Sequence, residues 1–151
     1  MLGGIIGWER DRAGKNAGVR THVLVCVACA FAVGLGELAL KDQLSGDRTR
    51  VLHAVITGVG FLGGGMIWTT KKSSGPYGLT SAATIMLVAV IGAACGLGAP
   101  ASAAAVTLLA LLTLVGIRRV EDLFDRRREA KGNREVLTVD TLIRPDRHDG
   151  V

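Results

Sequence analysis

Two short motifs have residue types and spacings that support chemistry in other proteins. Gly58, Gly60 and Gly63 form a G-x-G-x-x-G pattern, which in a soluble protein can bind the pyrophosphate of a dinucleotide. That function also needs an acidic residue about 20 positions later to bind the ribose. No Asp or Glu lies between Arg48 and Val120, so we expect no nucleotide at this motif.

The second motif is a C-x-x-C pattern formed by Cys26 and Cys29, with Cys95 as the third cysteine. A metal or redox site would need further ligands or a thioredoxin-like context, and both residues lie inside an apolar run. We expect free cysteines that fill apolar space. Because the sequence also has no nucleophile–base arrangement and no P-loop, it predicts a non-enzymatic protein without catalytic residues, metal or cofactor.

The elements that carry these motifs are long apolar runs. Of the 151 residues, 49% are hydrophobic and 21 are glycine. Four runs each approach the length of about 20 residues that crosses a bilayer as a helix; they are His22–Leu40, Val51–Trp68, Leu79–Gly98 and Ala101–Ile117. Since they have almost no polar face, a soluble bundle is the weaker interpretation. We predict an all-α, polytopic membrane bundle whose partner is the lipid bilayer.

The basic residues cluster between these runs. With few aromatic neighbours, they fit the flanks of membrane helices better than a nucleic-acid surface, in spite of a net charge of +5. The turn between the third and fourth runs carries no Lys or Arg, whereas the segment after the fourth is strongly basic. The positive-inside rule therefore places the C-terminus in the cytoplasm and the loop between the first and second apolar runs outside. That loop is the weak point, because its Lys41, Arg48 and Arg50 do not favour the outside.

Both ends of the sequence depart from a plain bundle. The first residues, MLGGIIG, are apolar but too short to span a membrane. We expect either the last two turns of a truncated first span or a stub that packs peripherally. We assign residues 1–117 to the transmembrane domain and residues 118–151 to a basic cytoplasmic tail, partly disordered. In the tail, alternate apolar residues from Leu137 to Ile143 predict a single strand, which needs partners to be stable.

The glycines of the stretch GVGFLGGG need a different explanation from nucleotide binding. Gly60 and Gly64 are spaced G-x-x-x-G, as are Gly3 with Gly7 and Gly92 with Gly96. Residues four apart share a face of a helix, and two glycines there allow another helix backbone to approach closely. We expect helix packing at this stretch. Its many glycines also leave open a local break or kink in the helix.

Three blocks of the sequence resemble the MgtC/SapB (YhiD-like) family of bacterial inner-membrane proteins, over roughly residues 3–117. The blocks are GIIGWERDRAGKNAGVRTHVLVCV, DRTRVLHAVITGVGFLGGGMI and GLTSAATIMLVAVIGAACGLG. The motif residues of the first block are Glu9, Arg10, Gly18, Arg20, Thr21 and His22. Those of the second are Asp47, Arg50, Gly58, Gly60, Phe61, Leu62, Gly63 and Gly65. Those of the third are Gly78, Leu79, Thr80, Ala82, Ala83 and Thr84.

The resemblance implies a plasma-membrane domain, usually of five spans, and a role in magnesium homeostasis, acid-stress adaptation and virulence. One branch of the family is associated with restraint of the membrane ATP synthase. We therefore predict a non-enzymatic regulator that acts by contact with another membrane protein, such as ATP synthase, or with a second copy of itself. Longer members carry a soluble C-terminal domain, of which REVLTVDTLIRPD would be a remnant.

The alternative function is a transporter or channel for an ion or small solute. A helix break within the glycine-rich second run would favour it, because freed backbone carbonyls can coordinate ions. The last three runs contain no carboxylate, which argues against it because a magnesium path needs oxygen ligands.

The polar motif residues have two interpretations as well. Glu9, paired with Arg20 or Arg10, would form a functional cluster at the cytoplasmic face. The simpler interpretation is that the cations there anchor helix ends and set topology. For Asp47 and Arg50, three residues apart, we favour a helix cap and an exposed ion pair over a functional site.

Overall fold

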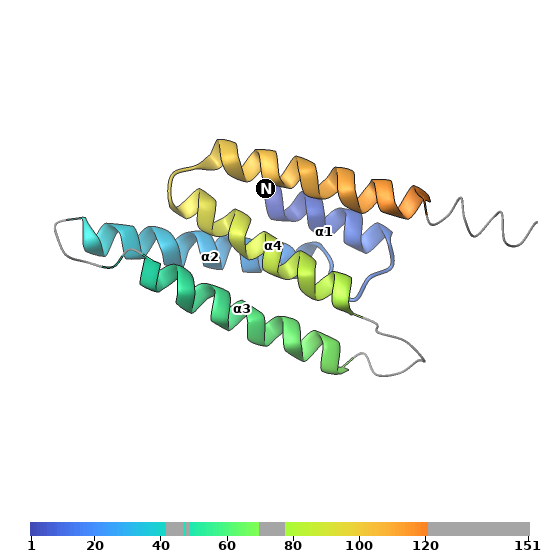
Figure 1. Ribbon diagram of the computed structural model, residues 1–151, viewed down its shortest axis with the longest axis horizontal. Coiled ribbons are helices and arrows are strands. Elements are labelled where there is room, and N and C mark those ends of the chain that lie inside the picture. The colour runs from blue at the N-terminus through green and yellow to red at the C-terminus, as the bar shows by residue number, and fades with distance from the viewer. Residues whose placement is uncertain (42–46, 48, 70–77, 121–151) are drawn as a thin grey trace, which may run out of the picture. The chain divides into compact units, whose positions relative to one another are not determined.

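The computed structural model describes residues 1–41, 47, 49–69 and 78–120, and the regular structure within them is α-helical (Figure 1). The helices are α1 (Leu2–Arg12), α2 (Val19–Leu40), α3 (Thr49–Thr69), α4 (Leu79–Gly96) and a last helix, Pro100–Val120. All but α1 are long and apolar enough to cross a membrane. The predicted fold class and the four predicted spans are therefore confirmed. Helices are expected there because lipid offers the backbone no hydrogen-bond partner.

The chain divides into two units, Met1–Leu111 and Leu112–Val151. The first contains α1 to α4 and the beginning of the last helix. The described part of the second, residues 112–120, is the end of that helix. The predicted cytoplasmic tail beyond it, with its predicted strand from Leu137 to Ile143, lies outside the described residues.

Two glycines flank α4, and a proline begins the helix that follows it. Gly78, which precedes the helix, has a φ of 91°, and Gly98, which follows it, has a φ of 76°. A residue with a Cβ adopts such angles only at a cost in free energy, so glycine is favoured at both turns. Pro100 then begins the last helix, at a position where its missing N–H is not needed.

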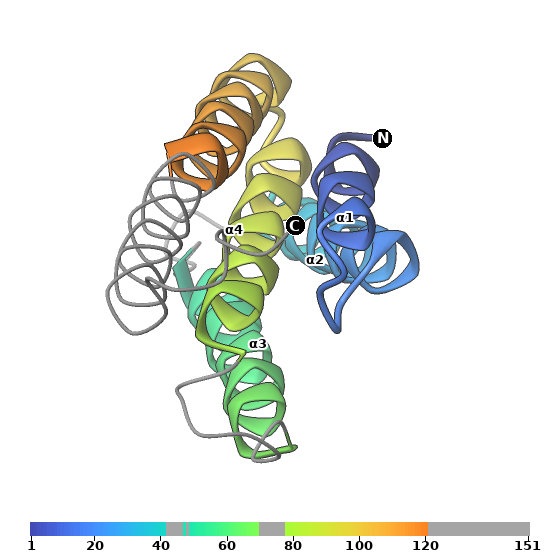
Figure 2. The same ribbon diagram turned by 90° about the vertical axis from the view of Figure 1, so that its right-hand side faces the viewer.

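Helix α4 is the centre of the first unit. Figure 2 shows it between α3 on one side and α1 with α2 on the other, and it contacts all three. In the apolar 18-residue stretch of each helix, 44% of the residues are buried in α4, compared with 17% in α2 and 11% in α3. Ile85, Val88 and Ala89 of α4 are almost wholly buried. The outer helices therefore present most of their apolar surface outward, as a bilayer requires.

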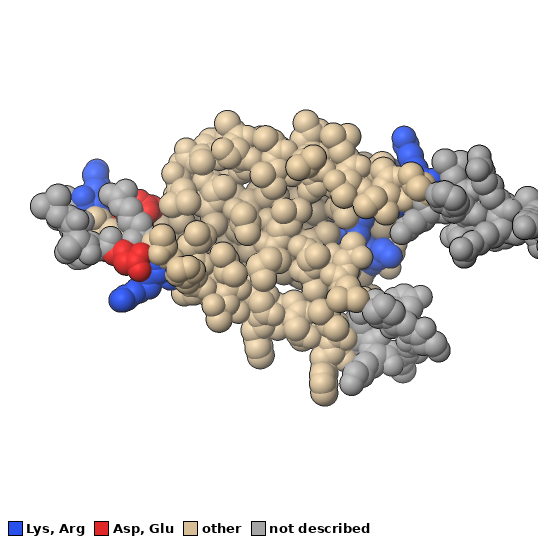
Figure 3. Space-filling view, viewed as in Figure 1, with Lys and Arg blue, Asp and Glu red and all other residues tan. Residues whose placement is uncertain are grey.

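Charged residues keep clear of this apolar zone. In Figure 3 the middle of the visible face is free of charged side chains, which gather towards the ends of the helices. Within the first unit, Lys41 follows the end of α2, while Arg12 and Lys15 lie at or after the end of α1. Such a separation suits an uncharged hydrocarbon layer between two aqueous boundaries.

The tightest helix contact is made by one of the predicted G-x-x-x-G pairs. Gly92 and Gly96 of α4 face α2 so closely that a Cβ on either would overlap a backbone carbonyl oxygen. For Gly92 that oxygen belongs to Cys26, and for Gly96 it belongs to Ala30. Packing of this pair is confirmed, and it brings the backbones of α2 and α4 into direct contact.

Helix α1 is joined to α2 in the same way. A Cβ on Gly7 would lie 2.6 Å from Cα of Val19, and one on Gly3 would lie 2.7 Å from Cβ of Cys26. Ile6, between these glycines, is fully buried. The expectation of a peripheral stub is therefore wrong. The helix has 11 residues, continues through the polar segment to Arg12, and packs against α2 and α4 because its glycine face admits them.

The glycines of the stretch GVGFLGGG differ in what they face. The stretch lies inside α3, which is an unbroken helix, so the predicted break is not found. A Cβ on Gly63 would touch Ala82 of α4 at 3.6 Å, and one on Gly60 would meet only the end of Met86 at 3.8 Å. A Cβ on Gly64 would meet nothing within 4 Å. The Gly60–Gly64 pair therefore makes no close helix contact within the described chain.

At two more glycines of this stretch, as at Gly64, an added Cβ would find open space. A Cβ on Gly58 or Gly65 would also meet nothing within 4 Å, and the Phe61 side chain is 82% exposed. We call these four positions, Gly58, Phe61, Gly64 and Gly65, the open face of α3. Because the glycines stand in the middle of a helix, they do not form a phosphate-binding loop.

Candidate functional site

Buried polar side chains collect where α1 ends and where α2 and α4 begin. Three are almost inaccessible: Arg10 is 3%, His22 0% and Thr84 3% exposed. Groups so deeply buried need partners, because an unpaired polar group costs free energy inside a protein. We call this region the polar junction, and it consists of Glu9, Arg10, Asp11, Gly18, His22, Ser81 and Thr84.

Glu9 and Arg10 are sequence neighbours in α1 and pair with each other. Both Nε and Nη2 of Arg10 contact the same oxygen, Oε2 of Glu9. The other oxygen, Oε1, is buried and has no hydrogen-bond partner among the described residues. Each charge therefore depends on the other, since removal of one partner leaves an uncompensated charge out of contact with water.

His22 connects α2 to α4. Its Nδ1 lies 2.8 Å from the carbonyl oxygen of Gly18, and its Nε2 lies 3.3 Å from Oγ1 of Thr84. The Thr84 hydroxyl donates to the carbonyl oxygen of Ser81 at 2.9 Å. Arg10 of α1 also acts on the ring electrostatically. The polar junction thus combines groups from α1, α2 and α4.

Asp11 caps α2 from the neighbouring helix. Its Oδ2 accepts a hydrogen bond from the backbone N–H of Val19 at 3.0 Å, in the first turn of α2. Gly18 makes room for this carboxylate, which a Cβ at that position would overlap. An acidic group at a helix N-terminus is also favoured by the helix dipole. The sequence did not reveal this role, because the cap crosses the turn between two helices instead of preceding its own helix.

The polar junction brings some predicted motif residues together and leaves others out. Glu9 pairs with Arg10, one of the two partners that the sequence left open. Thr84 contacts His22 across 62 positions of sequence, and Ser81 was not predicted at all. Other motif residues are exposed on the remaining sides of their helices: Arg20, Thr21, Leu79, Thr80 and Ala83. Neighbours in a sequence motif separate in this way because a helix turns successive side chains about 100° apart.

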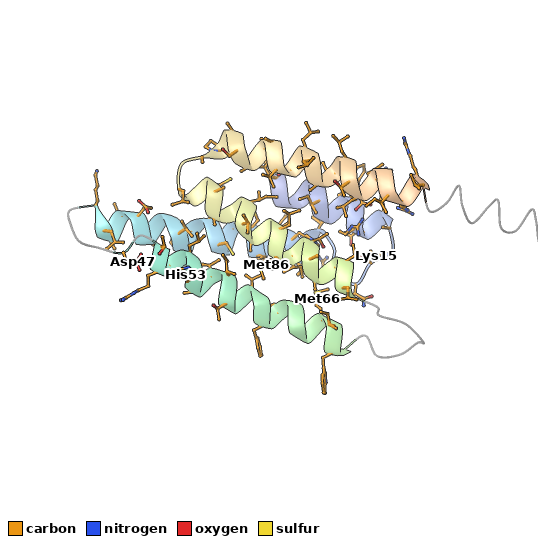
Figure 4. The ribbon with its side chains drawn as sticks, viewed as in Figure 1. Lys15, Asp47, His53, Met66 and Met86 are labelled. Atoms are coloured by element: carbon orange, nitrogen blue, oxygen red, sulfur yellow. The ribbon has the colours of Figure 1, made fainter. Side chains whose placement is uncertain are left out.

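Asp47, between α2 and α3, and Arg50, in the first turn of α3, lie at the other end of the first unit. Oδ1 of Asp47 accepts hydrogen bonds from the backbone N–H of Thr49 at 2.9 Å and from its hydroxyl at 2.7 Å. These bonds hold the pKa of Asp47 below its usual value. The helix cap predicted for Asp47 is confirmed, and His53 lies one turn further along α3 (Figure 4).

The remaining candidate for chemistry was the C-x-x-C motif. Cys26 and Cys29 are buried, free thiols on α2, as predicted. Within the described ranges, no group of three or more His, Cys, Asp or Glu is placed to hold a metal ion. The polar junction itself joins α1 to α2 through the Asp11 cap and α2 to α4 through the contact of His22 with Thr84, while its ion pair lies within α1.

Comparison with known proteins shows the family of this chain and several bacterial relatives. The model of the MgtC family matches residues 1–123. Protein MgtC of Brucella abortus (strain 2308) is 39% identical over 108 residues, which is 72% of this chain and 43% of the relative. Protein SrpB of Synechococcus elongatus is 38% identical over 134 residues, covering 80% of this chain and 71% of the relative.

A third relative has a name that refers to transport. The Escherichia coli (strain K12) protein named "Putative magnesium transporter YhiD" is 39% identical over 100 residues, which is 63% of this chain and 46% of the relative. The chain thus spans less than half the length of the Brucella and Escherichia relatives. No solved structure matches the chain.

Proposed function

Because the chain belongs to the MgtC family, we propose that it is a non-enzymatic regulator that acts by contact with another membrane protein. The family and the four membrane-length helices indicate a multi-pass membrane protein. The regulated response is adaptation to low magnesium or acid stress in the bacterial inner membrane. ATP synthase is one complex that the protein would contact, and a second copy of the chain is another partner.

The open face of α3 is the observation that carries the proposal of a contact function. Inside the chain, helices touch where glycines face a neighbour, as Gly92 and Gly7 do. The open face has the same residue type in the middle of a membrane-length helix, and a Cβ on Gly58 or Gly64 would meet nothing within 4 Å. Glycine faces support helix association in lipid, because close backbone approach gives van der Waals contact.

The polar junction has a supporting role in this proposal. The Asp11 cap joins α1 to α2, and the contact of His22 with Thr84 joins α2 to α4, against which α3 packs. His22 and Thr84 would therefore help to fix the geometry from which the open face is presented, and the Glu9–Arg10 pair would neutralise two buried charges within α1. The glycines and Phe61 of α3 would make the contact itself.

A transporter is the second candidate function. It is favoured by the name of the Escherichia coli relative and by the buried, ionisable groups of the polar junction. An ion path would use these groups directly, whereas a regulator would use them only to hold helices together.

Photo-crosslinking tests the contact function in the native membrane. We expect Phe61→p-benzoylphenylalanine, on the open face, to form adducts with a membrane protein. The matched control is Phe31→p-benzoylphenylalanine on α2, since Phe31 is also well exposed, at 67% against 82% for Phe61. This control should capture mainly lipid. Mass spectrometry of the adducts identifies the partner, and Gly64→Leu should reduce the capture at position 61.

Two outcomes contradict the contact function. One is equal protein capture at positions 61 and 31, or capture that is insensitive to Gly64→Leu. The other is a flux of magnesium or of protons across liposomes that contain only this protein, when liposomes without the protein show none. The second result would establish the transporter instead.

Labelling from outside the cell tests the proposed orientation. In a variant without cysteines, Ser45→Cys, between α2 and α3, should react with an impermeant maleimide. Ser73→Cys, between α3 and α4, should react only after the membrane is opened. This orientation is expected because Lys and Arg are retained in the cytoplasm. The turn before Pro100 has no Lys or Arg, whereas the segment after the last helix is rich in them. The reverse labelling pattern would place the C-terminus outside.

A further inference from the structure

The contacts of His22 cannot all be hydrogen bonds when its ring is neutral. Three contacts share the available protons: Nδ1 with the Gly18 carbonyl, Nε2 with the Thr84 hydroxyl, and that hydroxyl with the Ser81 carbonyl. The two carbonyl oxygens only accept. Each of the three contacts therefore needs its own proton from the ring or from Thr84.

A neutral imidazole has one N–H, and the Thr84 hydroxyl has one O–H, which makes two protons for three contacts. If Nδ1 carries the proton, Thr84 must choose between Ser81 and Nε2. If Nε2 carries it, the lone pair of Nδ1 faces the Gly18 oxygen at 2.8 Å. In either tautomer one contact is lost or becomes repulsive. The contact from Nε2 to Thr84 is the longest of the three, at 3.3 Å, and is therefore the weakest. We expect this contact to be lost when the ring is neutral.

A protonated ring removes the conflict. Nδ1–H then donates to Gly18 and Nε2–H donates to Thr84, which is left to donate to Ser81. The two contacts within helices, to Gly18 and to Ser81, are possible in both states, so the added proton serves the contact between α2 and α4. We infer that His22 is a proton-dependent latch between the N-terminal ends of α2 and α4, closed when the ring is protonated and open when it is neutral.

Groups on α1, α2 and α4 surround the His22 ring, and the charged ones affect how readily the ring is protonated. Burial of the ring opposes its positive charge most strongly, and Arg10 of α1 opposes it as well. The Gly18 carbonyl and Asp11 of α1 favour the charge, and Glu9 is paired with Arg10. Helix α4 offers only neutral partners near the ring, the Ser81 carbonyl and the Thr84 hydroxyl. On α2 itself, Arg20 is exposed to water and Cys26 lies one turn on. The latch requires only these groups and does not depend on what the protein contacts in the membrane.

The first test compares two substitutions of the partner. With His53→Gln and His148→Gln as background, ¹⁵N NMR of the ring in lipid nanodiscs follows His22 alone. We expect Thr84→Val to move the midpoint of the His22 titration to lower pH by about one unit, because the charged ring loses a hydrogen-bond acceptor. Thr84→Ser, which keeps the hydroxyl, should leave it within about 0.3 units. Equal midpoints for Thr84→Val and the parent protein would overturn the inference.

The second test keeps Thr84 and covers the case in which Thr84→Val does not fold. Spin labels replace Thr21 of α2 and Thr80 of α4, both exposed near the latch. The distribution of distances between them should broaden as the pH rises through the midpoint of the His22 titration, because the neutral ring releases Thr84. A distribution that does not change across the titration, or a ring that stays neutral from about pH 8 to about pH 4, contradicts the latch.

Discussion

Substitution of Gly92 by alanine is expected to prevent stable packing of α2 against α4. A single methyl group at this position would overlap the carbonyl oxygen of Cys26, and a backbone atom in a helix cannot move aside as a side chain can. The expected loss is about 3 kcal/mol or more, the upper range for an overpacked core. The measurement is the folded fraction of the protein in mild detergent, by size-exclusion chromatography and thermal unfolding.

The same substitution at Gly64 is the matched control. Gly64 stands in the middle of α3, and a Cβ there would meet nothing within 4 Å. Gly64→Ala should be neutral, or stabilise the purified protein by about 0.5 kcal/mol, because alanine loses less conformational entropy than glycine in a helix. If Gly92→Ala and Gly64→Ala lower the folded fraction equally, the α2–α4 contact is not as close as the structure has it.

Loss of one charge from the Glu9–Arg10 pair should have an effect of similar size. Arg10→Met keeps the length of the side chain but leaves the Glu9 carboxylate buried without its partner. Breaking a buried ion pair in this way costs about 3–5 kcal/mol. The measurement is the free energy of unfolding in detergent, from denaturant titration followed by circular dichroism.

Two further variants separate the ion pair from simple loss of a charge. Arg20→Met makes the same substitution at an exposed position of α2 and should change stability by less than about 0.5 kcal/mol. The double variant Glu9→Leu with Arg10→Met should be more stable than Arg10→Met alone, because it leaves no uncompensated charge. A double variant as unstable as the sum of its single changes would falsify mutual dependence of the two charges.

The spacing of the glycine pairs predicted close helix packing correctly for some pairs but not for all. The sequence presents Gly3 with Gly7, Gly60 with Gly64 and Gly92 with Gly96 as three equal candidates for close packing. In the structure the first and last pairs face α2, while the middle pair makes no close helix contact within the described chain. The spacing establishes that two glycines share a face of a helix, but not whether a neighbouring helix stands on that side.

For the polar junction, too, the sequence identified several of the residues but not which of them contact one another. The motif identified Glu9 as an unusual acid among cations, and it identified His22 and Thr84 as separate motif members. Which arginine pairs with Glu9, and the contact between His22 and Thr84, depend on how α1 and α4 are rotated against α2. The cap by Asp11 depends on the turn between α1 and α2, and no local pattern encodes that turn.

The sequence by itself determined the class of the protein, the number and approximate positions of its membrane-length helices, and its family. These follow from local quantities: an apolar run of sufficient length forms a helix in lipid whatever surrounds it, and Gly78, Gly98 and Pro100 end or begin helices through their own backbone preferences. The tertiary structure alone decided the continuity of α3, the depth at which α1 is packed and the membership of the polar junction. The physical reason is that helix rotation and neighbour choice are set by the fit of whole surfaces, in which one missing Cβ or one buried charge decides between arrangements that look alike in sequence.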